Sequence, residues 1–189
     1  MVTEENVSFC NCFCSFGIRF YLTPLHKIEM SKLSLRQADW RTIRLAGRKG
    51  GEMEKQNVFN DLLVLDFSRY LPGGYATQPF ADWGSEVIKV EDTGQGDFCR
   101  HDPPTRHGIS YYSTALCRNK QSISLNLKDE EAKEYCIKLA SKADIIVESF
   151  RPGVTKRLGI DYETIKKQNP KIIYASISAY GQKDPRSVS

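Results

Sequence analysis

The sequence predicts an α/β fold in which helices flank a parallel sheet. In residues 62–91, an apolar run, a turn with two glycines, a segment of helical spacing and a second apolar run form a βαβ unit. Apolar runs and helical segments alternate again over residues 122–178, which is typical of a parallel sheet. The first run is apolar throughout, as in a parallel strand that is covered on both faces.

The opening βαβ unit has recognisable boundaries. Its strands are predicted at residues 62–67 and 87–91, and Gly84 is placed to end the helix between them. The helix carries large apolar side chains at Tyr75, Phe80 and Trp83. The turn at residues 71–74 is open to two interpretations: its glycines bring backbone N–H groups to an anionic ligand, or they only make a tight turn. The spacing is not GxGxxG, which disfavours an NAD-binding protein.

The middle of the chain is predicted to be loops. Residues 92–97 are rich in glycine and acid, and residues 101–108 contain two prolines. His101 and His107 are candidate ligands or bases, or simply solvated side chains. Residues 109–115 form either a short helix or a short strand.

Strands and helices alternate in the last third of the chain. The run 122–127 alternates like a half-exposed strand, and acidic residues at 129–131 begin a helix. The buried stripe of that helix is Ala132, Tyr135, Cys136, Leu139 and Ala140. A buried strand at 145–147, a helical turn at 154–158 that Gly159 closes, a helix at 162–168 with Asp161 as N-cap and a strand at 172–178 follow.

Composition narrows the possible functions. Of the 189 residues 40% are hydrophobic, which suits one globular domain. Residues 1–57 carry nine Lys or Arg and six Asp or Glu, whereas residues 58–189 carry 18 and 17, so the predicted domain is nearly neutral and no nucleic-acid partner is expected. Without an apolar stretch of about 18 residues, no membrane span is predicted. The cysteine run Cys10, Cys12 and Cys14 lacks a matching downstream group, so no metal site is expected.

The sequence divides into a basic extension, residues 1–57, and a domain, residues 58–189. From Met30 to Gly51 the extension is rich in Ser and Arg, poor in acids and amphipathic at helical spacing. Two interpretations remain open: a mitochondrial presequence, or a poorly ordered basic segment of a cytoplasmic protein.

A ligand of a parallel sheet binds beyond the carboxyl ends of its strands. Four predicted turns lie there, at residues 69–74, 92–97, 149–153 and 179–182. The basic side chains available to a phosphate-bearing ligand are Arg69, Arg118, Lys120, Lys128, Arg151 and Arg157.

Five segments occur in an order and spacing that resemble one family: VLDFSRYLPGGYATQPFADWGSEVIKVE, GQGD, YYSTALCRNKQSISLNLK, ADIIVESFRPGVTKRLGIDYE and NPKIIYASISAYGQ. Over residues 62–182 the chain resembles the N-terminal part of a family III CoA-transferase (the CaiB/BaiF, or formyl-CoA transferase, type). The resemblance implies a Rossmann-like large domain and an interlocked homodimer. It also implies transfer of coenzyme A between an acyl-CoA and a carboxylic acid, with an Asp carboxylate as nucleophile.

The resemblance implies CoA contacts at Leu71, Pro72, Leu125, Asn126, Leu127, Lys128, Ser149, Phe150, Arg151 and Arg157. Phe150 offers a face to the adenine, while Lys128 and Arg157 offer charge to the phosphates. Two positions depart from the family pattern. Ser149 replaces the usual Asn, and Asp92 stands where some members have a phosphate-facing Arg.

The end of the chain departs further. Residues 183–189 diverge before the segment that holds the family's catalytic Asp, so we expect a truncated product that lacks this residue; Asp184 is too early to replace it. The favoured subgroup is a succinyl-CoA-dependent enzyme for glutarate or hydroxymethylglutarate. The alternatives are a 2-methylacyl-CoA racemase-like member, which usually has a shorter connection at residues 100–112, and a non-catalytic CoA-binding fragment.

Overall fold

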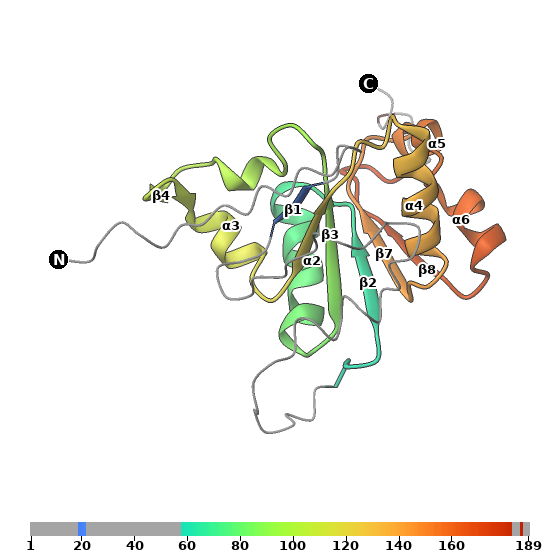
Figure 1. Cartoon of the computed structure of the whole chain (residues 1–189), viewed down its shortest axis with the longest axis horizontal. Coiled ribbons are helices and arrows are strands. Elements are labelled where there is room, and N and C mark those ends of the chain that lie inside the picture. The colour runs from blue at the N-terminus through green and yellow to red at the C-terminus, as the bar shows by residue number, and fades with distance from the viewer. Residues whose placement is uncertain (1–18, 22–57, 183–185, 187–189) are drawn as a thin grey trace, which may run out of the picture.

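A computed structural model describes residues 19–21, 58–182 and 186 of the chain (Figure 1). Predictions for the presequence-like segment, for the cysteine run at residues 10–14 and for Asp184 lie outside the described residues. Within the described part, no helix is long and apolar enough to cross a membrane.

Six strands form one sheet in the order β1-β6-β3-β2-β7-β8. Their bounds are Arg19–Tyr21 (β1), Leu63–Asp66 (β2), Glu86–Glu91 (β3), Gln121–Ser124 (β6), Ile145–Glu148 (β7) and Ile173–Ser176 (β8). The last five are parallel, whereas β1 runs antiparallel to β6 and was not predicted. Along the parallel strands the spatial order is third, second, first, fourth and fifth, which is the Rossmann order. The predicted α/β class and parallel sheet are confirmed.

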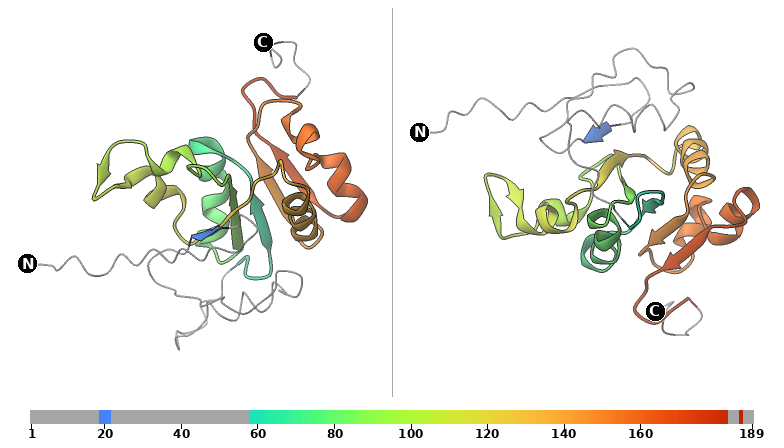
Figure 2. Two further views of the ribbon diagram at one scale, coloured as in Figure 1. Left: turned by 45° about the horizontal axis from the view of Figure 1, so that its top comes forward. Right: turned by 90° about the horizontal axis from the view of Figure 1, so that it is seen from below.

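Helices cover both faces of the sheet, as Figures 1 and 2 show. Alternate residues of β2 point to opposite faces, so Leu63 and Leu65 join a core with residues of α4 and α6, whereas Val64 joins one with residues of α2. The helices are α2 (Tyr70–Asp82), α3 (Tyr111–Leu116), α4 (Glu130–Ala140), α5 (Val154–Leu158) and α6 (Tyr162–Gln168). All four residues of β2 are buried, as predicted for its apolar run.

The predicted turn at residues 71–74 is wrong, because these residues form the start of α2. Pro72 is tolerated there since the first backbone N–H groups of a helix have no partner within the helix. Gly73 is required by packing, because a Cβ atom at this position would lie 1.8 Å from the Cβ of Ser68. The glycine therefore brings the helix against the end of β2 and makes no turn.

Short elements lie between and within the predicted loops at residues 92–97 and 101–108. A 3-10 helix, η1, spans Phe98–Arg100, and a small hairpin pairs β4 (Thr105–Arg106) with β5 (Ile109–Ser110). The open choice at residues 109–115 resolves into β5 followed by α3.

Three further helix boundaries are confirmed, whereas two predicted strands end earlier than expected. Gly84 and Gly159 have φ angles of +99° and +72° and follow the ends of α2 and α5, and the carboxylate of Asp161 accepts the Thr164 N–H as an N-cap. The strand predicted at 122–127 ends at Ser124 because the chain then enters the turn before α4, and the strand predicted at 172–178 spans only Ile173–Ser176.

Candidate functional site

The site is centred where the order of the strands reverses. The chain leaves β2 toward β3 and later places β7 on the opposite side of β2, and ligands of such sheets bind beyond the carboxyl ends of the strands at this point. The loops after β2 and β7 meet at one point, because the Arg69 N–H donates to the Ser149 hydroxyl over 2.9 Å. The sequence predicted Arg69 and Ser149 in two turns at the carboxyl ends of strands, and the strand order makes these turns neighbours.

The Arg69 side chain links three loops at this edge. Its guanidinium carbon lies 5.7 Å from the ring centre of Phe150 and 5.8 Å from that of Phe98. A guanidinium nitrogen also lies 3.2 Å from a carboxylate oxygen of Asp92. Arg69 therefore packs against two aromatic rings and forms an ion pair at the same time. These contacts hold the loops after β2, β3 and β7 next to one another.

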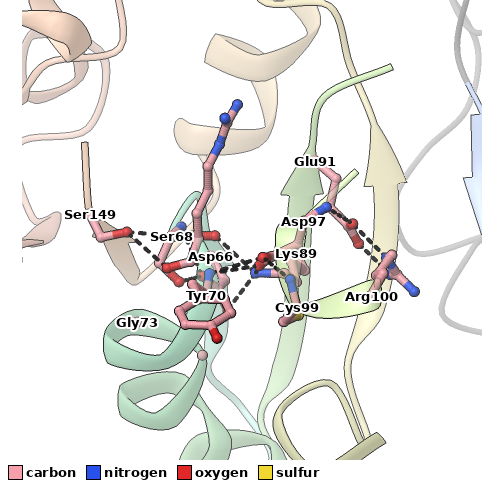
Figure 3. A network of polar contacts seen from close by, with 12 residues as sticks. Asp66, Ser68, Tyr70, Gly73, Lys89, Glu91, Asp97, Cys99, Arg100 and Ser149 are labelled. Carbon is pink, nitrogen blue, oxygen red and sulfur yellow. Dashed lines mark hydrogen bonds and ion pairs between the residues drawn. The ribbon is translucent and has the colours of Figure 1, made fainter. Parts of the chain in front are cut away.

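A buried ion cluster supports the loop after β2 (Figure 3). Lys89 Nζ lies 2.7 Å from Asp97 Oδ2 and 4.0 Å from Asp66 Oδ2, and it donates to the Ser68 carbonyl over 2.9 Å. Lys120 Nζ lies 3.1 Å from the same Asp66 oxygen. The two lysines and two aspartates are all buried and balance in charge, which is the condition under which buried ions are tolerated.

Asp97 fixes the backbone at the start of α2. Tyr70 has a φ of +61°, a conformation that costs free energy for a residue with a side chain. Its N–H donates to Asp97 Oδ1 over 2.9 Å, and the Cys99 N–H donates to the same oxygen over 3.1 Å. The carboxylate thus holds the strained residue that sets where Leu71 and Pro72 project.

Glu91 forms a second buried ion pair beside the first. It accepts from Arg100 Nε over 2.7 Å, from the Ser122 hydroxyl over 2.6 Å and from the Asp97 N–H over 2.8 Å. Gly96 has a φ of +73°, and a Cβ there would lie 2.7 Å from a Glu91 oxygen. The close approach of this loop to Glu91 therefore requires the glycine and the aspartate of the GQGD segment, Gly96 and Asp97.

The charges in the cluster shift one another's pKa. Burial alone would raise the pKa of Asp97 and of Glu91, but Lys89 and Arg100 respectively overcome it, so both carboxyls have a lowered pKa. Burial would also lower the pKa of Lys89, yet the charges of Asp66 and Asp97 raise it. For Lys120 burial dominates, and its pKa is lowered despite Asp66.

We expect the unfolding free energy to fall in acid. A carboxyl with a lowered folded pKa contributes stability above its ordinary pKa, which is 4.5 for Glu91, and loses that contribution as the pH falls through the folded pKa. Glu91→Gln should therefore cost about 1–3 kcal/mol near neutral pH. Urea unfolding across acid and neutral pH measures this. The prediction would be contradicted if the difference in unfolding free energy between the wild type and Glu91→Gln did not decrease in acid.

The structure brings some of the predicted CoA contacts together. Leu71, Pro72, Ser149, Phe150 and Arg151 lie at the carboxyl ends of β2 and β7, and Leu71, Pro72 and Arg151 are exposed. The segment of Leu125, Asn126, Leu127 and Lys128 follows β6, and Arg157 lies on α5, which begins just after the β7 loop. Leu125 is buried in the core and its N–H donates to the Glu91 carbonyl over 2.8 Å, so the structure does not expose it beside the other predicted contacts.

Three basic side chains named as phosphate candidates have structural partners, and Arg69 is one of them through its ion pair with Asp92. Lys120 is buried and also bonds the Thr77 hydroxyl over 2.6 Å and the Gly74 carbonyl over 2.9 Å. Arg118 forms an ion pair with Asp82 at 2.6 Å, near the opposite end of α2. Lys128, Arg151 and Arg157 are exposed.

Sequence reasoning missed the buried support of the site. Lys89 and Glu91 interrupt the second apolar run of the opening βαβ unit, and that position is itself the signal, because a charge that a strand buries needs a partner. Asp97 follows Gly96 in the GQGD segment, but its partner lies on another element. His101 is exposed and bonds the Gln95 carbonyl over 2.9 Å. Among the described residues, no group of three His, Cys, Asp or Glu side chains is placed to hold a metal ion.

Comparison with known proteins agrees with this geometry. Residues 59–188 match the model of CoA-transferase family III. The chain belongs to this family. It spans about a third of the length of the curated relatives that it matches.

Named relatives are transferases of CoA. The chain is 43% identical over 127 residues to the acetyl-CoA:oxalate CoA-transferase of Acetobacter aceti, which covers 67% of this chain and 33% of that protein. It is 39% identical over 142 residues to the human succinyl-CoA:glutarate CoA-transferase, which covers 75% and 32%. A crystal structure of a CaiB/BaiF family protein from Brucella suis is similar with a TM-score of 0.64 and 34% identity, covering 68% of this chain and 35% of that one.

Proposed function

We propose that this family III chain supplies the CoA-binding edge of an enzyme that moves coenzyme A from an acyl-CoA to a carboxylic acid. The observation that carries the proposal is the meeting of the β2 and β7 loops through Arg69 and Ser149 at the point where the strand order reverses. This contact sets Leu71, Pro72 and Phe150 along one edge, as expected for a long ligand with a nucleotide end.

The proposed roles follow from side-chain chemistry. Phe150 offers an aromatic face to the adenine, while Arg151, Arg157 and Lys128 are exposed cations for the phosphates. Leu71 and Pro72 form an apolar contact for the pantetheine arm. Leu125, Asn126 and Leu127 contribute backbone and polar groups from the turn after β6, and Ser149 orients the two loops.

The chemistry proposed for the whole protein is transfer of CoA through a carboxylate. An Asp carboxylate attacks the thioester carbonyl and displaces the CoA thiolate, which then attacks the aspartyl carbonyl of the mixed anhydride, so that the first carboxylate leaves and an enzyme–CoA thioester remains. The acceptor carboxylate attacks this thioester and displaces the CoA thiolate again, and the thiolate attacks the acceptor's carbonyl in the new anhydride, so that the new acyl-CoA leaves and the Asp carboxylate is restored. We expect the nucleophilic Asp to lie C-terminal to Gln182, and we assign its role to no residue of this chain. By the similarity above, the proposed substrates are succinyl-CoA and a dicarboxylic acid such as glutarate. From the presequence-like segment and the family resemblance of the sequence, we also propose a mitochondrial, homodimeric enzyme.

Titration of the full chain with CoA tests the proposal. We expect saturable heat with CoA and none with NAD, because the loop after β2 lacks a dinucleotide fingerprint. A folded chain, checked by circular dichroism, that binds neither ligand would refute it. CoA binding without turnover of succinyl-CoA and glutarate would favour a non-catalytic CoA-binding role.

A paired substitution then locates the site. Arg151→Ala should weaken CoA binding by about 10- to 150-fold, since a charge-assisted phosphate contact contributes about 1.5–3 kcal/mol. Lys167→Ala removes an equally exposed cation from α6 and should leave the affinity unchanged. Equal losses in both variants would point to general electrostatic attraction in place of a phosphate contact at the β7 loop.

A further inference from the structure

The Arg69 guanidinium has a charge partner but no hydrogen-bond acceptor in the described part of the chain. One of its nitrogens lies 3.2 Å from Asp92 Oδ2, and this ion pair does not have the geometry of a hydrogen bond. Its other neighbours are the rings of Phe98 and Phe150, 5.8 and 5.7 Å from the guanidinium carbon. A stacked guanidinium with unused N–H donors therefore lies at the proposed CoA-binding edge.

Arg118 shows how a structural arginine differs. Its Nε and Nη2 donate to the two carboxylate oxygens of Asp82 over 3.1 and 2.6 Å, and its Nη1 donates to the Ala115 carbonyl over 2.8 Å. All three guanidinium nitrogens of Arg118 thus have acceptors. Arg69 instead keeps its donors available for an acceptor that comes from outside the described residues.

The backbone that carries the Arg69 side chain is fixed. Its N–H donates to the Ser149 hydroxyl over 2.9 Å. On either side of it, the Ser68 carbonyl and the Tyr70 N–H are hydrogen-bonded to the buried ion cluster, as Figure 3 shows. The guanidinium therefore extends from a fixed position between two aromatic rings, so a ligand has little of the chain to order when it binds there.

Asp92 keeps its own position without Arg69. Its Oδ1 accepts the Gly94 N–H over 2.8 Å, and its backbone carbonyl accepts the Ser124 hydroxyl over 2.8 Å. The side chains of Asp92 and Arg69 are each 41% exposed, and ion pairs with this exposure contribute little free energy. An anion with more charge and more acceptor oxygens can therefore replace Asp92 as the partner of Arg69.

We propose that Arg69 binds a phosphate group of the ligand and that this phosphate takes the place of Asp92. The inference rests on the proposed CoA function and adds one contact to it. The planar fork of a guanidinium matches two oxygens of a phosphate. Without ligand, Asp92 neutralises the cation. With ligand, Asp92 is an anion beside a phosphate, so the two partners have opposite effects on affinity.

Calorimetric titration of the full chain with CoA tests the exchange of partners. Arg69→Met keeps an apolar stem against the two rings and the backbone contact with Ser149 but removes the charge. It should weaken CoA binding by about 10- to 150-fold, and Arg69→Lys should recover part of the loss. Asp92→Asn should strengthen binding by about two- to fivefold, because its side-chain oxygen can still accept from Gly94 while the competing charge is gone.

The matched control is Arg118→Ala. This substitution removes an exposed arginine that is also paired with an aspartate, near the opposite end of α2, and it should leave the affinity for CoA unchanged. If the Arg69–Asp92 pair only held the loops together, Arg69→Met and Asp92→Asn would both weaken binding. The opposite signs expected for these two variants separate phosphate binding from a structural role.

Dephospho-CoA identifies which phosphate is bound. Contact with the 3′-phosphate predicts that Arg69→Met binds CoA and dephospho-CoA equally well, whereas contact with the diphosphate predicts the same loss for both ligands. The proposal is overturned if the wild type binds CoA and Arg69→Met binds it equally well, or if Asp92→Asn weakens binding as Arg69→Met does. A wild-type chain that circular dichroism shows to be folded and that binds no CoA overturns the proposed function as well.

Discussion

Replacing Lys89 with methionine should lower the free energy of unfolding by about 3–5 kcal/mol. The substitution keeps the apolar stem but removes the ammonium group that lies 2.7 Å from Asp97 and 4.0 Å from Asp66. Removing one partner of a buried ion pair leaves the other charge without compensation, and this costs more than the pair itself contributes. The Ser68 carbonyl would also lose its donor. Urea unfolding at neutral pH measures the loss.

The matched control for this prediction is Lys167→Met on α6. Lys167 is exposed, so its substitution should change the unfolding free energy by no more than about 0.5 kcal/mol. Adding Asp97→Asn to Lys89→Met removes the uncompensated charge and should recover part of the stability. A Lys89→Met chain as stable as the Lys167→Met chain would show that the buried pair does not support the fold.

The sequence was sufficient for the elements that have strong local signals. The apolar run of β2, the glycine after α2 and the acidic first turn of α4 each place a boundary by their own chemistry. The same holds for the site edge, because the carboxyl ends of parallel strands are identifiable from the order of strands and helices. These features depend on residues close together in the chain, and sequence patterns report such features well.

The buried ion cluster could not be read in the same way. Asp66 and Lys120 are 54 residues apart, and their 3.1 Å contact exists because β2 and the chain before β6 are both packed against α2. Nothing in the local sequence distinguishes Lys120, which is buried, from Arg118, which is exposed. The pairing of β2 with β7, the first and fourth of the parallel strands, puts Ser149 beside Arg69 and is likewise a property of the whole sheet.

Gly73 shows how a local pattern can be interpreted wrongly. A Pro-Gly-Gly run usually marks a turn, because glycine and proline disfavour the interior of a helix. Here Pro72 lies in the first turn of α2, where it breaks no helix hydrogen bond, and Gly73 is buried against Ser68. The glycine is required because the helix and the strand lie close together, and the local sequence does not show this distance.

Gly73→Ala should therefore destabilise the chain by about 3 kcal/mol, at the upper end of the range for overpacked sites. The new Cβ would lie 1.8 Å from the Ser68 Cβ, so α2 or the loop after β2 must move. Gly74→Ala is the matched control on the same helix. Its Cβ would lie 3.3 Å from that of Leu116, and the higher helix propensity of alanine offsets the tight contact, so the net change should stay within about 1 kcal/mol.

A second substitution separates steric clash from helix propensity. Ser68→Gly removes the atom that Gly73→Ala would strike, although it also removes the hydroxyl that donates to Asp66. The double variant should be more stable than Gly73→Ala alone if the clash dominates, because the two changes then couple favourably. If the double variant is instead less stable by the full cost of Ser68→Gly, the clash is not the cause. The same motion of α2 would displace Leu71 and Pro72, so Gly73→Ala should also weaken CoA binding if these residues contact the ligand.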